Sequence, residues 1–580
     1  MSLSAAFVFP LNVYAHLLEL REGRVDYLHY GVFQSPDEPV AVAQQLASDL
    51  VHEVLPAPCR LLEVGIGLGT TQAHLRSAGY AATGITPDGA QIHAARERYA
   101  DTIAVEQSRL EDYDRDAGQW QALLFQESGQ YIPPVALFEA ADRLLHDGPS
   151  TIVVMDEFAL DRREDAHHGL HSLGAFCTLA ARRGWTLTKR VDLSQQVRPS
   201  LDYLQRGLEA VAEPLMADLG ITQEQLALLA ASNRRYQRLY DEGVYGYALL
   251  RFDRPAKPAE RLVDIGPEHA AAMRQLFADV FRHEMSPEHW HWKYGDGRGR
   301  GVGLMRGERM LAHYGGVTRR VLCRGQPVLA SQSCDVMVDR RGQAGLVRHG
   351  PMSQVASTFL ETQLGWGQPH RLGFGFPSDR AFGAAERLGL YAAVDAVTRA
   401  SWPAAVRRGG DVADELRPAD LEPGGRRRAV VDGLWGLMAE SLRDAVVCVR
   451  DAAWLHHRYF ARPGVTYEAF YLRRRWTRRP VGVVVLRRHE GHLEVLDLVG
   501  PPSAFPALIA QARRRAAECG LQRVDCWITV SQLHLLSAID PPAFTATPLG
   551  ITVPANVHTP GPVDEVKDRW FLLAGDADFT

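Results

Sequence analysis

The sequence contains little that would direct it to nucleic acid. Its 580 residues include 64 basic and 69 acidic side chains, so the formal net charge is −5. No excess of positive charge is therefore present to attract a phosphate backbone. Lysine is scarce, with only four residues, and no ladder of aromatic and basic residues for stacking bases occurs. We expect no nucleic-acid partner.

Metal and membrane signals are also missing. The seven cysteines form no C-x-x-C pair and have no histidines at zinc-finger spacing. The densest histidine group, residues 167–171, has no carboxylate at metal-site spacing. The apolar stretch at the start has no basic head, and Arg21, Glu22 and Arg24 close it before it reaches the length of a bilayer span. We expect no metal, no membrane partner and a cytoplasmic protein.

The length predicts two or three domains. In the first part, short Val/Ile/Leu runs alternate with helical patterns, as a parallel sheet with crossover helices requires. Strands are expected at 59–67, 80–86, 101–107, 121–127 and 150–158, with helices at 90–100 and 134–148. This pattern predicts a doubly wound α/β domain over residues 1–252, followed by a proline-containing linker at 253–260.

The rest of the chain is typical of an α+β fold with longer antiparallel strands. Residues 302–322 and 481–500 are each broken by a glycine turn and predict two hairpins. Similar aromatic and basic segments, 290–294 and 454–459, precede them and indicate two related halves. A polar stretch rich in proline and glycine, 411–428, is expected to join these halves. The predicted domains are therefore 261–428 and 429–580.

The strongest chemical signal is a glycine turn after the first strand, Glu63-Val64-Gly65-Ile66-Gly67-Leu68-Gly69. Glycines let a ligand approach the backbone, because a Cβ would collide with it. Dinucleotide-binding folds use a similar turn but need G-x-G-x-x-G and an acidic residue at the end of the second strand. That strand ends here at Thr86-Pro87 without a carboxylate. The missing acid argues against NAD.

The same segment resembles class I S-adenosylmethionine (SAM)-dependent methyltransferases, in the branch of cyclopropane-fatty-acid synthases and tocopherol and sterol methyltransferases. That branch commonly carries G-I-T-L-S-x-x-Q after its second strand. Residues 84–91 match at Thr86 and Gln91, with Pro-Asp in place of Leu-Ser, and Asp88 is expected to cap the next helix. Residues 26–31 are similar to the family's "HYG" segment. The resemblance covers residues 25 to about 160 and implies a substrate-side cap in the region up to 252.

The resemblance also implies which residues hold SAM. The methionine portion would contact the glycine turn and the first strand, the ribose would contact the end of the second strand, and the adenine would lie after the third. The implied residues are Glu63, Gly65, Gly67 and Gly69 for the methionine portion, Thr86 and Gln91 for the ribose, Leu110 and Glu111 for the adenine, and Gln126 and Tyr30 for the amino-acid end.

A catalytic base is optional in this chemistry. A sulfonium is already a strong methyl donor, so the protein mainly aligns the reactants and excludes water. Glu127 is the first candidate base, followed by His29 and Tyr131. The structural alternatives are that Glu127 caps the next helix or pairs with an arginine, and that His29 is a packed histidine. Asp156 and Glu157, on the usual ligand edge of the sheet, are candidates for a substrate role.

A second resemblance follows the strand at 333–338. A basic glycine turn and a helix come after it, and such a turn forms an anion cradle. The segment resembles GNAT acyltransferases, whose corresponding loop holds the pyrophosphate of acyl-coenzyme A. In the family pattern R-x-x-G-x-G/A, this chain has alanine at one glycine and Leu346 at the other, and the tyrosine that protonates the departing thiolate falls at Ala385. The implied coenzyme A residues are Val336, Val338, Arg341, Gly342 and Gly345, with Tyr391 as the substitute acid.

Two hypotheses about function remain. The first is a bifunctional biosynthetic enzyme that transfers a methyl group from SAM to a small molecule and an acyl group from acetyl-CoA or another acyl-CoA. The second is a SAM-dependent methyltransferase or SAM cyclase whose GNAT-like half is a non-catalytic binding or scaffold module. Residues 429–580 have no comparable phosphate loop, and we expect them to be architectural or to form an acceptor-side wall.

Overall fold

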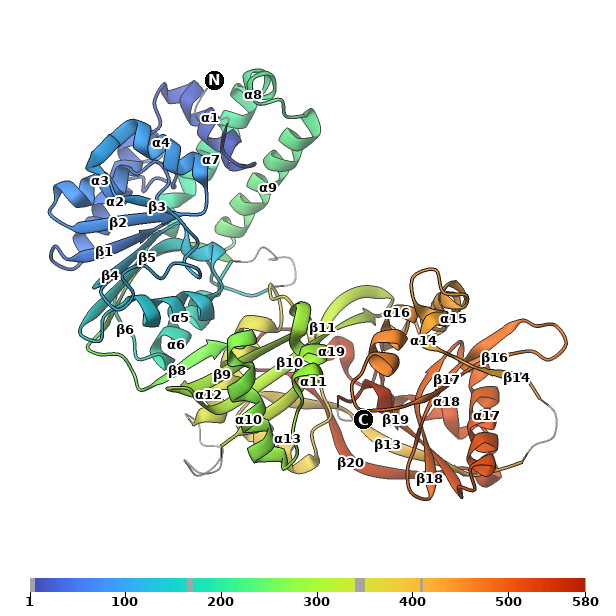
Figure 1. Cartoon of the computed structure of the whole chain (residues 1–580). Helices are drawn as coiled ribbons and strands as arrows, with labels where there is room; N and C mark the ends of the chain where they lie inside the picture. Colours follow the sequence, from blue (N-terminus) through green and yellow to red (C-terminus); the bar gives the residue numbers. More distant parts are fainter. Residues whose placement is uncertain (1–5, 164–169, 340–349, 407–409, 579–580) are drawn as a thin grey trace. The chain divides into compact units, whose positions relative to one another are not determined.

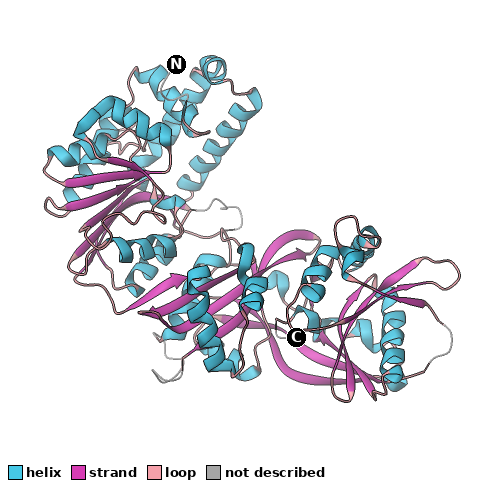
Figure 2. Cartoon of the chain, viewed as in Figure 1, coloured by secondary structure: helices cyan, strands magenta, loops and turns pink. Residues whose placement is uncertain are grey.

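A computed structural model of the chain describes residues 6–163, 170–339, 350–406 and 410–578. The chain divides into two compact units, Met1–Val263 and Asp264–Thr580 (Figure 1). Helices pack on strands in both units, as the cyan and magenta elements of Figure 2 show. The mixed α/β architecture predicted from the sequence is confirmed.

The sheet of the first unit has the order β3-β2-β1-β4-β5-β7-β6. Strands β1 to β5 are parallel, and β7 runs antiparallel between β5 and β6. All five strands predicted from the sequence are present. The order reverses between β1 and β4, which is where doubly wound sheets bind ligands. The bounds are β1 Arg60–Val64, β2 Ala81–Thr86, β3 Val105–Gln107, β4 Ala122–Gln126, β5 Ser150–Ala159, β6 Thr186–Asp192 and β7 Tyr245–Arg254.

Helices cover both faces of this sheet, so its central strands are buried throughout. Every residue of β4 and β5 is buried, as expected for parallel strands between two helical layers. Asp88 caps α4 by accepting a hydrogen bond from the Ala90 backbone N–H at 2.8 Å, which confirms the predicted cap. The helices are α2 Val40–Val54, α3 Thr70–Ser77, α4 Gly89–Tyr99, α5 Pro134–Leu144 and α6 Leu173–Arg182.

The region after β5 is only partly a cap. β6 and β7 complete the sheet, because the apolar run of β7 is buried beside β5. The expectation of a cap up to residue 252 is wrong for these two strands. The cap itself consists of α1 Leu11–Glu22, α7 Ser194–Ala210, α8 Ala212–Leu219 and α9 Gln223–Asp241, which share an apolar cluster.

A second sheet has the path β12-β11-β10-β15-β21, with β9 between β10 and β8. β9 and β10 form the hairpin predicted at 302–322. β11 and β12 are parallel and pair at 330–332 and 372–374, where β12 ends. The bounds are β8 Glu260–Asp264, β9 Gly299–Arg306, β10 Arg309–Cys323, β11 Gln326–Val338, β12 Leu372–Phe374, β15 Val446–Cys448 and β21 Trp570–Phe571, with helices α10 Ala270–Phe281, α11 Pro287–Tyr294, α12 Pro351–Gln363 and α13 Asp379–Arg387.

The third sheet has the order β14-β16-β17-β18-β19-β13-β20. β17 and β18 form the hairpin predicted at 481–500. The strands are β13 Tyr391–Pro403, β14 Val412–Glu415, β16 Glu468–Arg473, β17 Pro480–Arg488, β18 His492–Val499, β19 Arg523–Thr529 and β20 Thr545–Asn556. The helices are α14 Pro418–Leu421, α15 Arg428–Ser441, α16 Ala452–Leu455, α17 Phe505–Glu518, α18 His534–Ser537 and α19 Val563–Val566.

The two halves of the second unit exchange strands. β13 precedes residue 428 but lies in the third sheet, while β15 and β21 follow it and lie in the second sheet. The stretch 411–428, which composition suggests is a linker, contains β14 and α14, and β14 pairs with β16. A cut near residue 428 would therefore separate strands that share a sheet.

The two similar aromatic and basic segments, 290–294 and 454–459, make the same kind of contact in the structure. The Tyr294 hydroxyl donates to Asp335 Oδ2 at 2.6 Å, and the Tyr459 hydroxyl donates to Asp497 Oδ2 at 2.9 Å. In both cases a tyrosine that ends the aromatic and basic segment reaches a buried aspartate on a strand. This correspondence supports two related halves, the tandem arrangement expected from the sequence.

Candidate functional site

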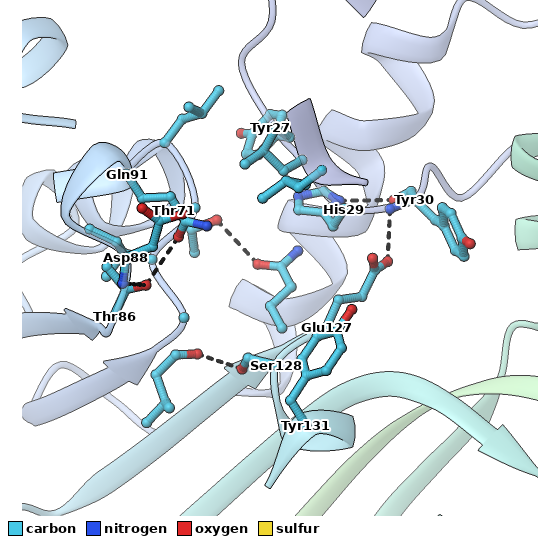
Figure 3. Close-up of a pocket in the computed structure, with 18 of the residues that line it drawn as sticks. Tyr27, His29, Tyr30, Thr71, Thr86, Asp88, Gln91, Glu127, Ser128 and Tyr131 are labelled. Atoms are coloured by element: carbon cyan, nitrogen blue, oxygen red, sulfur yellow. Dashed lines mark hydrogen bonds between the residues drawn. The ribbon is translucent and has the colours of Figure 1, made fainter. Parts of the chain in front are cut away.

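The first unit contains a cavity of about 770 Å³ at the carboxyl ends of β1 and β4. The glycine turn after β1, the segments that follow β2, β3 and β4, and cap residues from α1 and α7 line it. Figure 3 shows how side chains from these elements converge. The sequence-predicted residues that line it are His29, Tyr30, Glu63, Gly65, Gly67, Thr86, Gln91, Leu110, Glu111, Gln126, Glu127 and Tyr131.

The glycines of the turn are required for different reasons. A Cβ on Gly65 would lie 2.5 Å from Ser128 Cβ, so this glycine allows the segment after β4 to pack on the turn. A Cβ on Gly67 would meet only Leu28 Cδ1, at 3.8 Å, and would otherwise project into open space. Gly69 immediately precedes α3, and a Cβ there would lie 2.9 Å from Ala95 Cβ. Unlike Gly65 and Gly67, it is not among the described residues that line the cavity, so its predicted contact with the methionine portion stays a prediction. Gly67 is therefore the position whose missing side chain leaves room for a ligand.

Two buried polar atoms beside this turn lack partners among the described residues. Glu63 on β1 is 2 % exposed, its Oε2 accepts no hydrogen bond, and burial raises the pKa of the carboxyl to about 8. On β4, Gln126 Oε1 accepts from the Thr71 hydroxyl at 3.1 Å, but the buried Nε2 donates to nothing. Unsatisfied buried groups are costly and signal a missing partner. An acceptor and a donor on neighbouring strands suit the ammonium and carboxylate of an amino acid.

The residues predicted for the ribose meet at the end of β2. The Thr86 hydroxyl donates to Gln91 Oε1 at 3.1 Å and accepts from the Asp88 backbone N–H at 3.3 Å (Figure 3). This leaves the Gln91 amide nitrogen as a donor beside the cavity. Leu110 and Glu111 follow β3 and line the same cavity. The positions predicted for the SAM nucleoside thus lie along one wall.

Among the described residues, Glu127 neither caps the next helix nor pairs with an arginine, which were the two structural alternatives to a catalytic role. Its Oε1 accepts from the Tyr30 backbone N–H at 2.7 Å and from the Tyr247 hydroxyl at 2.6 Å, and the structure gives it no arginine partner among the described residues. Burial raises the pKa of this carboxyl to about 7. A carboxyl that titrates near neutrality is suited to accept and release a proton. Tyr247 lies on β7, and no local motif in the sequence points to it.

His29 and Tyr131 are weaker candidate bases. The His29 Nδ1–H donates to the Tyr30 carbonyl at 2.8 Å, and the buried Nε2 has no partner among the described residues. Burial lowers the pKa of His29 to about 4, so the ring is neutral at pH 7. Tyr131 is 79 % exposed at the rim of the cavity. All three residues line the cavity, but only Glu127 has a pKa near neutrality.

In the second unit, hydroxyl groups collect beside the end of the β11–β12 pairing. Tyr314 on β10 bonds Ser333 on β11 at 2.8 Å and also bonds the hydroxyl of Tyr391, the first residue of β13. Burial and the neighbouring Tyr314 raise the pKa of Tyr391 well above its ordinary value. Tyr391 therefore holds its proton at neutral pH.

The remaining residues predicted for coenzyme A lie on or after β11. Val336 is 41 % exposed and Val338 is half-buried, whereas Arg341, Gly342 and Gly345 lie outside the described residues. Asp335 is held by Lys293 Nζ at 2.8 Å and by the Tyr294 hydroxyl, so its role is structural.

In the third sheet, the parallel strands β18 and β19 continue beyond their paired residues, and another segment of the chain packs between them. β18 and β19 pair only at 492–495 and 523–526. Beyond this point, the Thr529 hydroxyl donates to the Trp570 carbonyl, and a Cβ on Gly575 would lie 2.7 Å from the Leu496 carbonyl. Asp576 in the same segment pairs with Arg319 at 3.0 Å and with Arg450. The segment 570–578 thus fills the cleft between these strands.

Neither a metal site nor a membrane span is found in the described part of the chain. No three His, Cys, Asp or Glu residues within it are placed to hold a metal ion. Within the same ranges, no helix combines the length and apolar character that crossing a bilayer needs.

Comparison with known proteins assigns a family to part of the chain. Residues 264–391 match the model of the family described as "Acetyltransferase (GNAT) domain", and no curated protein matches. A solved structure of a probable N-acyltransferase from Enterococcus faecalis V583 is 14 % identical and covers 52 % of this chain and 72 % of its own, with a TM-score of 0.41.

Two methyltransferase structures align with a smaller share of the chain. A putative sarcosine dimethylglycine methyltransferase from Galdieria sulphuraria is 14 % identical and covers 42 % of this chain and 98 % of its own, with a TM-score of 0.37. A geranyl diphosphate C-methyltransferase from Streptomyces coelicolor A3(2) is 17 % identical and covers 43 % and 99 %, with a TM-score of 0.32. The chain thus combines a Rossmann-like sheet in its first unit with a GNAT domain in its second.

Proposed function

We propose that this chain is a bifunctional biosynthetic enzyme that joins SAM-dependent methyl transfer to a small molecule with acyl-CoA-dependent acyl transfer. One observation carries the first activity. Glu63 and Gln126 line the same cavity as Gly67, and among the described residues Glu63 Oε2 is an unpartnered acceptor and Gln126 Nε2 is an unpartnered donor. Both atoms are buried where a doubly wound sheet binds its ligand.

The lining fits SAM group by group. Glu63 would accept from the ammonium, and Gln126 would donate to the carboxylate of the methionine portion. Thr86 and Gln91 would hold the ribose hydroxyls, and Leu110 would face the adenine. When bound, SAM supplies an electrophilic methyl group. The chain's own residues then orient the acceptor and exclude water, while Glu127 takes up a proton where the acceptor must lose one.

Titration calorimetry with SAM tests this assignment directly. We expect one binding site per chain in the wild type, and no detectable binding at micromolar SAM would refute the assignment. Mass spectrometry of products formed from methyl-labelled SAM then separates methyl transfer from a cyclase or other SAM chemistry. Label found in the product supports methyl transfer, whereas an unlabelled product contradicts it. Any ligand that co-purifies with the protein, identified by the same method, would name the acceptor.

Acyl transfer by the second unit is supported by the GNAT match and by the hydroxyls at the end of the β11–β12 pairing. Tyr391 holds a proton that it could give to a departing thiolate, and Tyr314 and Ser333 connect to it. Calorimetry with acetyl-CoA on the full chain tests this activity. Binding supports it, while an absence of binding would favour the alternative that this unit is a scaffold.

Residues 429–580 have an architectural role in this proposal. The observation that favours it is the cleft between β18 and β19, which the segment 570–578 occupies. A second coenzyme A molecule would have to displace the buried Asp576 and its arginine partners. We therefore expect acetyl-CoA to bind with a stoichiometry of one per chain.

A further inference from the structure

Part of the cavity of the first unit is lined by Tyr14, Glu127, Tyr131 and Glu157 together with Tyr30, the residue predicted for the amino-acid end of SAM, and we call this part the acceptor chamber. Figure 3 shows Glu127 between the rings of Tyr30 and Tyr131. Burial raises the pKa of all three tyrosines, and the nearby Glu157 carboxyl raises it further. The chamber therefore brings two acidic groups together with three aromatic rings.

The carboxylates of this chamber have hydroxyl and backbone partners but no cationic one among the described residues. Glu157 Oε1 accepts from the Tyr240 hydroxyl at 2.8 Å, and burial raises the pKa of its carboxyl to about 8. Asp156 is buried next to it and accepts from the Gln130 backbone N–H at 3.0 Å. Arg109 is the one arginine or lysine in the described cavity lining, and it follows β3 beside Leu110. The acceptor chamber thus gathers acidic groups with no cation beside them among the described residues, and a bound ammonium group would favour their ionised forms.

Buried acidic groups are normally paired with a cation, because an isolated charge in a protein interior is costly. Faces of aromatic rings also attract cations, and amines and quaternary ammonium groups are recognised in this way. An anionic acceptor would meet no basic side chain here and would oppose the ionisation of Glu127 and Glu157. At the mouth of the same cavity, Val8 and Phe9 are 70 % and 42 % exposed and offer apolar contact.

We propose that the acceptor is an amine with an apolar body, whose ammonium group binds between Glu127 and Glu157 against the tyrosine rings. This inference rests on the proposed methyl transfer and names its substrate class. Glu127 takes one proton from the bound ammonium, which leaves the nitrogen lone pair free to act as the nucleophile. The nitrogen–methyl bond would form as the bond between that methyl carbon and sulfur breaks, so that the electron pair stays on sulfur and S-adenosylhomocysteine leaves. The apolar body of the acceptor lies toward Val8 and Phe9.

Three small probes of similar shape test the charge preference on the full chain. They are phenethylamine, 2-phenylethanol and phenylacetate, which are a cation, a neutral molecule and an anion at pH 7. Their binding is measured by calorimetry or ligand-observed NMR. We expect the amine to bind about ten-fold more tightly than the alcohol, and the carboxylate to bind more weakly than both. Equal affinity of the amine and the alcohol, or no binding of the amine, would overturn the inference.

Two variants test whether the acceptor chamber causes the preference for the amine over the alcohol. We expect Glu127→Gln and Glu157→Gln each to reduce the ratio of amine to alcohol affinity to about three-fold or less, because each removes a carboxyl group that a bound ammonium would ionise while keeping the side-chain shape. Glu53→Gln removes the same group from an exposed position on α2 and should leave the ratio unchanged. A ratio that stays at the wild-type value in both chamber variants would contradict the proposal. Thermal melting of each variant verifies that the unit is folded.

A SAM titration on the same protein separates this inference from the proposed function. If SAM binds and the probes show no preference for the amine, the proposed function stands and the amine inference fails. If SAM does not bind, the proposed function fails, and the probe ratios still decide whether the chamber selects a cation. The two failures therefore give different results in the same experiment.

Discussion

Binding of SAM should release a proton from Glu63, and Glu63→Gln should abolish that release. In the empty cavity this carboxyl is buried without a partner for Oε2 among the described residues, and its pKa is about 8. The carboxyl is therefore mostly protonated at pH 7. An ammonium placed against it stabilises the ionised form and lowers the pKa, so that the proton leaves as the ligand binds.

The size of the effect follows from the titration of one group. With a pKa of about 8, roughly 0.9 proton is bound at pH 7, and nearly all of it is lost if the pKa falls below about 5 in the complex. Because the proton must leave, the affinity of the wild type for SAM should rise by up to about tenfold per pH unit as the pH increases toward 8, and then level off.

Calorimetry in buffers with different ionisation enthalpies measures the number of protons released. The wild type and the surface control Glu53→Gln should release close to one proton at pH 7. Glu63→Gln should release almost none and should bind SAM about ten-fold to a hundred-fold more weakly, with little change in affinity between pH 6 and 8. If Glu63→Gln releases as many protons as the wild type, the contact between Glu63 and the ammonium is refuted.

Three further changes test other parts of the structure. Gly67→Asp should abolish SAM binding, because its side chain enters the open space beside the turn and adds a charge near Glu63; normal affinity by calorimetry would contradict the assigned turn, and unchanged melting of the second unit is the control. Asp576→Asn should destabilise the second unit by about 3–5 kcal/mol, because Arg319 and Arg450 lose a buried counter-charge; denaturant unfolding measures this loss, and unchanged stability would exclude it. Tyr391→Phe should lower the rate of acyl transfer at least about ten-fold without weakening acetyl-CoA binding; an unaltered rate would remove Tyr391 as the acid.

The sequence predicted the elements that depend on local patterns. The strands before and after the glycine turn are specified by apolar runs, and the start of α4 is specified by Asp88, whose side chain acts within two residues of itself. The wall of the cavity follows from the same strands, because the carboxyl ends of parallel strands meet at one edge. Glu63, Thr86 and Gln126 could be placed on this edge without knowledge of any long-range contact.

Features that depend on distant parts of the chain could not be predicted in this way. Tyr247 bonds Glu127 across 120 positions, and nothing around either residue indicates that β7 lies beside β5. The strand exchange in the second unit was missed for the same reason, because the polar composition of 411–428 reflects local exposure, whereas the placement of β13 depends on β19 and β20. Sequence patterns report on neighbours along the chain, and these contacts join residues far apart in it.

The buried charges of the second unit also constrain how it can be made. Lys293 bonds Asp578, which is 285 positions later in the chain, and Arg319 bonds Asp576, which is 257 positions later. A ribosome adds about 5–20 residues per second, so these cations remain without that counter-ion for about 13 seconds or longer during synthesis. The unit therefore matures late and from non-local contacts, a regime of slow folding in which unfinished chains depend on chaperones.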